Sequence, residues 1–220
     1  AMGLRSSDQY ISVVLHETFH AYQARTAPAR FEAAQKAYAA EREYPWDDAE
    51  VRRAWGLELE LLARAINVQS DHEAADLARQ FIQVRRKRHS SPAMSQASID
   101  YERQVEWLEG LGKYAELKTW QEASLLQRRG YRPVRELASD REFSNYSRFS
   151  RRWSGEMSTM KSQASRRGDI RFYYSGMAQA FLLDRLVSSW KSRVRLDDLS
   201  MDELLAQALA GRQEGLPDRH

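Results

Sequence analysis

The chain has 220 residues, a formal net charge of +3 at pH 7 and no cysteine. The lack of cysteine excludes disulfides, thiolate metal ligands and a cysteine nucleophile, which leaves histidine, glutamate and aspartate as metal-binding side chains. Hydrophobic residues make up 42% of the chain and charged residues 30%, a composition typical of a globular protein with many amphipathic helices. We expect a single domain over residues 1–220, because this length can bury one core.

The sequence predicts neither a membrane-spanning helix nor a nucleic-acid partner. No stretch approaches the roughly 18 consecutive apolar residues that a spanning helix needs. The small positive charge falls short of a nucleic-acid footprint. Ala1-Met2 resembles a cloning remnant, so we expect the chain to have been cut from a longer protein. Compartment and oligomeric state stay open.

Helical periodicity recurs through nearly the whole chain, so the expected fold is mainly α with little or no sheet. The first helix is expected to begin at Ser7-Asp8 and to end near Arg25, before Pro28. Further helices are expected at 29–43, 47–66, 70–87, 98–126, 144–163 and 170–187, with a last one opened by 200–203. Residues 89–95 have loop composition, and we expect them outside the packed body, beside the basic run 85–88.

The most specific motif lies in the first predicted helix, where residues 16–20 are His-Glu-Thr-Phe-His. Residues four apart share one helix face, so His16 and His20 can direct two imidazole nitrogens at one point, as a tetrahedral zinc site requires. Glu17 lies about 100° further round the helix, where its carboxylate can reach a metal-held water as general base. Because the flanking residues are uncharged, we expect this helix in the core.

A catalytic zinc needs a third protein ligand, and Glu109 is the expected one. It precedes two glycines, Gly110 and Gly112, in an otherwise strong helix pattern, and each glycine costs roughly 1 kcal/mol relative to alanine. Close approach of this helix to another backbone is the expected compensation. Glu58, in the expected helix 47–66, is the alternative ligand, although its Leu-Glu-Leu-Glu context is more typical of a surface stripe.

The residues from Glu109 to Glu116, Glu-Gly-Leu-Gly-Lys-Tyr-Ala-Glu, resemble the Glu-Gly-Phe-Ala-x-Tyr-x-Glu segment of the gluzincin metallopeptidases, especially the zinc aminopeptidases. The resemblance implies a zincin-like catalytic domain in which Glu109 binds zinc together with His16 and His20. This chain places more residues between the histidines and Glu109 than those enzymes do.

Residues 173–178, Tyr-Tyr-Ser-Gly-Met-Ala, are similar to the Tyr-x-Lys-Gly-x-Ala segment of the same aminopeptidases. The similarity implies that the Tyr173 hydroxyl steadies the oxyanion of the tetrahedral intermediate. Ser175 stands where those enzymes have lysine. The chain also has no Gly-Ala-Met-Glu-Asn-like segment, so an exopeptidase specificity does not follow.

These features predict a zinc-dependent hydrolase, a peptidase acting on a peptide or protein substrate, with Glu17 activating the attacking water. Glu116 is expected either to fix a histidine or to form a solvated salt bridge. One alternative is a non-catalytic helical scaffold or partner-binding domain stabilised by zinc. Another is a basic module for an anionic polymer, although arginine runs without aromatic neighbours are more typical of a solvated face. Its cations would be Arg85, Arg86, Lys87, Arg88, Arg151, Arg152, Arg166 and Arg167.

Overall fold

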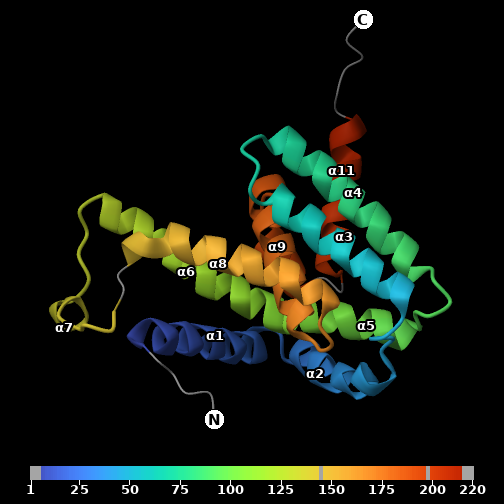
Figure 1. The fold of residues 1–220 in the computed structure, drawn as a ribbon, viewed down its shortest axis with the longest axis horizontal. Helices are drawn as coiled ribbons and strands as arrows, with labels where there is room; N and C mark the ends of the chain where they lie inside the picture. The colour runs from blue at the N-terminus through green and yellow to red at the C-terminus, as the bar shows by residue number, and fades with distance from the viewer. Residues whose placement is uncertain (1–5, 144–145, 197–198, 215–220) are drawn as a thin grey trace, which may run out of the picture.

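The computed structural model describes residues 6–143, 146–196 and 199–214, and within these ranges it contains helices and turns but no β-strand. The mainly α prediction is therefore confirmed (Figure 1). The helices are α1 Ser7–Thr26, α2 Pro28–Ala37, α3 Ala49–Ala65, α4 Asp71–His89, α5 Gln96–Val105, α6 Leu111–Arg128, α7 Arg135–Ala138, α8 Phe149–Ser162, α9 Ile170–Leu186, α10 Trp190–Leu196 and α11 Met201–Glu214. Among the described residues, no helix combines the length and apolar character needed to cross a membrane.

Capping side chains fix several helix starts close to where the sequence predicted them. The Asp48 carboxylate accepts hydrogen bonds from the first backbone N–H groups of α3, and the Ser70 hydroxyl accepts one at the start of α4. The predicted helix 98–126 is formed by α5 and α6, joined by a π-helical turn at Glu106–Gly110. The predicted helix start at Ser144 lies outside the described residues. The short helices α7 and α10 were not predicted.

Helix α9 forms the centre of the fold. It contacts the π-helical turn, α6, α11 and α3, and most of its side chains are buried, Phe172, Met177 and Leu182 among them. Figure 1 shows α3 and α4 side by side over one end of the continuous α5–α6 rod, while α1 lies along α6 at the edge of the molecule. The core therefore holds the α5–α6 rod in place, and the rod in turn supports α1.

Helix α1, which carries the His-Glu-x-x-His motif, does not lie in the core, so that part of the fold prediction was wrong. Only Ser12 and Gln23 of this helix are buried, whereas Val14 and Tyr22 are each 43% exposed. The physical reason is that α1 contacts α6 and α2 along one side, and no described element covers its outer face. Uncharged residues in a sequence therefore did not imply burial here.

The basic run near the end of α4 is a solvated face, as expected, only at Arg86 and Lys87. Arg85 and Arg88 are buried, and both donate hydrogen bonds to Glu58. Arg85 also makes a bidentate pair with Glu106 at 2.8 and 2.6 Å, and Arg88 pairs with Glu102. The two arginines are three residues apart and so share the inner face of α4, where these glutamates balance their charge. The following loop also packs inward through Met94, which is 8% exposed.

Candidate metal centre

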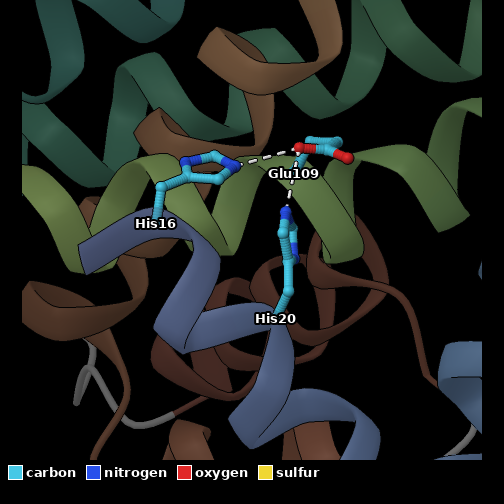
Figure 2. A group of neighbouring side chains, drawn as sticks. All are labelled: His16, His20 and Glu109. Atoms are coloured by element: carbon cyan, nitrogen blue, oxygen red, sulfur yellow. Dashed lines mark hydrogen bonds and ion pairs between the residues drawn. The ribbon is translucent and has the colours of Figure 1, made fainter. Parts of the chain in front are cut away.

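Three side chains from two distant segments converge at the contact between α1 and the π-helical turn. Figure 2 shows His16 and His20 reaching from α1 towards the carboxylate of Glu109. The Nε2 atoms of both histidines lie near the same oxygen, Oε2 of Glu109, at 3.0 Å from His16 and 3.3 Å from His20. The two histidine rings stand nearly perpendicular, at 82°. The fold thus brings together the three residues predicted as metal ligands.

Two of the donor separations in this group are close to those of a tetrahedral zinc site. Zinc bonds to nitrogen and carboxylate oxygen are about 2.0–2.2 Å long, so donor atoms at tetrahedral angles stand about 3.3–3.5 Å apart. The separations of 3.0 and 3.3 Å are close to that spacing, and one donor atom from each residue falls within 4.8 Å of the other two. Two imidazoles and one carboxylate are also a donor set typical of catalytic zinc, because they leave a fourth position open.

Backbone features in the α5–α6 rod bring Glu109 to this position. The π-helical turn adds a residue to the helical turn that carries Glu109, and such insertions frequently mark functional sites. Gly112 faces His16: a Cβ there would lie 2.8 Å from the ring Cε1. Gly110 instead packs against α9, and a Cβ added at Gly110 would lie 2.5 Å from Gly176 Cα. A close approach to another backbone is therefore present at Gly110, but it is to α9 and not to the motif helix, and at Gly112 the neighbour is a ligand side chain.

Gln23 orients His20, and the sequence analysis missed it. The Nδ1–H of His20 can donate to Oε1 of Gln23 at 2.9 Å, and Nε2 of Gln23 donates to the Trp107 carbonyl at 2.8 Å. In the neutral imidazole this bond would hold the proton on Nδ1 and leave Nε2 available to a metal, as a partner on the second nitrogen does in metal sites. Gln23 is three residues after His20, so its place on the ligand face of the helix was readable from the sequence.

Two tyrosines surround Glu109. Tyr173 stacks on His16, with ring centroids 6.0 Å apart, and lies close enough to Glu109 to help lower the pKa of that carboxyl, while the Tyr38 hydroxyl lies 3.5 Å from Glu109 Oε1. Burial, followed by the charge of Glu109, raises the pKa of both tyrosines well above the usual value, so both remain protonated donors at neutral pH. Nothing in the sequence pattern had pointed to Tyr38.

Glu109 itself stays ionised. Burial opposes its ionisation, but hydrogen bonds from His16 and His20 outweigh that effect and lower its pKa to about 2.

Glu17 is exposed on α1 and lines the same cleft as the three convergent residues and Tyr173. The cleft has a volume of about 620 Å³, within the range of roughly 300–1,000 Å³ that ligand pockets occupy. Its other walls come from α6 and α8 through Lys113, Glu116 and Arg152. All the predicted catalytic and ligand residues therefore face one solvent-accessible cavity.

The other carboxylates considered as site residues have structural partners elsewhere. Glu58 is completely buried between Arg85 and Arg88 and takes no part in the His16–His20–Glu109 group. Glu116 pairs with Arg152 and lies 3.7 Å from Lys113. It is mostly buried, so of its two predicted roles the salt bridge is present, but not as a solvated one.

Comparison of the chain with protein-family models, with characterised proteins and with solved structures found no match. The site therefore has to be interpreted from its own geometry and chemistry.

Proposed function

We propose that this chain is a zinc-dependent hydrolase of the gluzincin type that cleaves peptide bonds. The observation that carries the proposal is the convergence of His16, His20 and Glu109 around one point at donor spacings suited to zinc. When bound, zinc would lower the pKa of a water molecule and polarise a substrate carbonyl. The hydrogen bond that His20 can donate to Gln23 supports the same assignment.

Glu17 and Tyr173 supply the acid–base and electrostatic parts of the proposed reaction. The Glu17 carboxylate takes the proton of the attacking water and returns it to the leaving amine. Tyr173, held protonated beside Glu109, donates to the oxyanion that develops on the carbonyl, a contribution of about 2.7–4 kcal/mol for comparable donors. Both residues line the cleft that contains the proposed ligands.

A non-catalytic, zinc-stabilised scaffold is the second candidate function, and one observation favours it. Only two side chains of α1 are buried, so a metal that joins α1 to Glu109 would add substantially to the attachment of this helix. A purely structural site, however, gives no role to Glu17.

The experiment that separates the two functions compares Glu17→Gln with the wild type. Glu17→Gln should bind about one zinc per chain, like the wild type, yet lose at least about 100-fold in hydrolysis. A mixed peptide library, analysed by mass spectrometry with and without chelator, provides the substrates. Glu60→Gln, an exposed glutamate on α3, is the matched control and should behave as wild type.

Two outcomes would contradict the proposal. Zinc-loaded wild type that cleaves no peptide favours the scaffold, and cleavage that survives unchanged in Glu17→Gln refutes the assigned base.

A further inference from the structure

The cleft at the proposed metal centre continues along α1 towards its N-terminal end. There it meets a second hollow, of about 520 Å³, between α1, α6 and the start of α8. Gln9 and Arg152 line both cavities, so the second hollow adjoins the cleft of the proposed metal ligands. We call these two adjoining hollows the groove; together they offer room for an extended chain, which advances about 3.3–3.6 Å per residue.

The charge of the groove changes along its length. Around the metal centre the acids Glu17, Glu109 and Glu116 outnumber the cations Lys113 and Arg152. In the second hollow, Arg148, Arg151 and Arg152 face a single acid, Asp8. A bound zinc ion would offset the excess of acids at the metal centre, so the distinguishing feature of the groove is the basic character of the second hollow.

The arginines of the second hollow are available to a ligand to different degrees. Arg152 is already paired with Glu116, although its buried Nε has no hydrogen-bond partner. Arg148 and Arg151 are exposed and three residues apart, and no ion pair within the described ranges involves either of them. Both guanidinium groups can therefore still donate hydrogen bonds to a carboxylate, whose two oxygens match the paired N–H donors of arginine.

On the basis of the proposed function, we infer that the groove selects peptides with acidic side chains on one side of the scissile bond. Carboxylates beyond the cleaved bond would lie over Arg148 and Arg151, while the bond itself lies at the metal centre. Arg148 and Arg151 therefore favour acidic side chains on that side of the bond.

The test measures binding and does not require turnover. Zinc-loaded Glu17→Gln protein is titrated with fluorescent peptides of equal length that are neutral, acidic in the N-terminal half, acidic in the C-terminal half, or acidic throughout. One half-acidic peptide should bind about fivefold or more tightly than the neutral peptide, as expected for two partly exposed charge pairs. This gain should shrink as salt is raised, because surface charges are screened.

Charge reversal tests the assigned residues. The double variant R148E/R151E should abolish the gain for the half-acidic peptide and transfer it to a peptide that is basic in the same half. The control R86E/K87E reverses two adjacent exposed cations on α4 and should leave the preference unchanged.

Equal binding of the neutral and half-acidic peptides would overturn the inference, and so would an equal gain from acidic residues in either half of the peptide. Neither result bears on the proposed reaction, which is judged separately by Glu17-dependent cleavage of neutral peptides in the wild type.

Discussion

The imidazole of His16 lies against the backbone of Gly112, in space that the Cβ of any other residue would occupy. A Cβ at Gly112 would come within 2.8 to 3.1 Å of three ring atoms of His16. The side chain of one proposed ligand is therefore positioned by the absence of a side chain on the neighbouring helix. A substitution at Gly112 should therefore disturb the metal centre, whereas a substitution at a glycine that faces backbone should disturb the fold.

Gly112→Ala should weaken zinc binding while the protein stays folded. The added methyl group displaces the ring of His16, which can move because it is the end of a side chain, and so breaks its alignment with Glu109. Loss of the interactions that hold a metal ligand in its correct orientation typically lowers metal affinity about 10–100-fold. Competition with a fluorescent chelator measures the loss, and unchanged affinity would contradict the close packing. Gly155→Ala, where nothing lies within 4 Å of the new Cβ, is the matched control.

Gly110→Ala and Gly176→Ala should reduce the free energy of unfolding. A Cβ at Gly110 would lie 2.5 Å from Gly176 Cα, and a Cβ at Gly176 would lie 2.5 Å from the carbonyl oxygen of Glu106. These neighbours are backbone atoms, so α9 and the π-helical turn must separate, at a cost of about 1–3 kcal/mol. Urea denaturation measures the change. Gly155→Ala should instead gain up to about 1 kcal/mol through helix propensity, and equal behaviour of all three variants would refute the argument.

Glu109→Gln and Glu58→Gln should have opposite consequences. Glu109→Gln removes a proposed ligand and should weaken zinc binding with little effect on the folded state. Glu58→Gln leaves Arg85 and Arg88 short of a buried counter-charge, which typically costs about 3–5 kcal/mol, but should spare zinc binding in the protein that remains folded. Calorimetry for zinc and urea denaturation for stability separate the two. Loss of zinc from a folded Glu58→Gln protein would make Glu58 the ligand instead.

Gln23→Leu should lower zinc affinity by about 10–100-fold, as loss of a partner that orients a metal-binding histidine generally does. The change removes both the acceptor for His20 and the donor to the Trp107 carbonyl. Gln23→Glu keeps the acceptor and should retain much of the affinity. Gln35→Leu, at an exposed position on α2, controls for the added leucine. If Gln23→Leu and Gln35→Leu bind zinc equally well, Gln23 does not orient the ligand.

Zinc affinity should rise with pH through the titration of His20. Burial lowers the pKa of His20, but hydrogen bonds with Glu109 and Gln23 outweigh burial and raise it above 6.5. In the metal-free protein this shift contributes stability that is fully present below pH 6.5 and is lost as pH rises through the raised pKa. Zinc needs the neutral imidazole, so the proton and the metal compete over the same range.

Calorimetric zinc titrations in buffers with different ionisation enthalpies count the protons released. Release should decline as pH rises from about 6 to 8. Glu109, with a pKa of about 2, stays ionised throughout this range and does not contribute. Proton release that does not depend on pH would contradict the assignment to His20.

The local features of this protein follow from short-range sequence signals. Capping residues such as Asp48 and Ser70 mark helix starts because they bond to backbone N–H groups two or three positions away. The spacing of His16 and His20 places both on one helix face by helical geometry alone. The cost of two glycines after Glu109 likewise indicated a close contact before its partners were known.

Only the tertiary structure decided which faces are covered and which charges meet. Val14 and Arg85 illustrate this: the apolar residue is exposed and the charged one buried, because burial depends on which elements pack against a helix, and the sequence of that helix does not contain this information. The convergence of Glu109 on the two histidines and the bond between Gln23 and the Trp107 carbonyl join segments far apart in the chain. Such contacts depend on the packing of α1 and α9 around the α5–α6 rod, which no periodicity within a single helix determines.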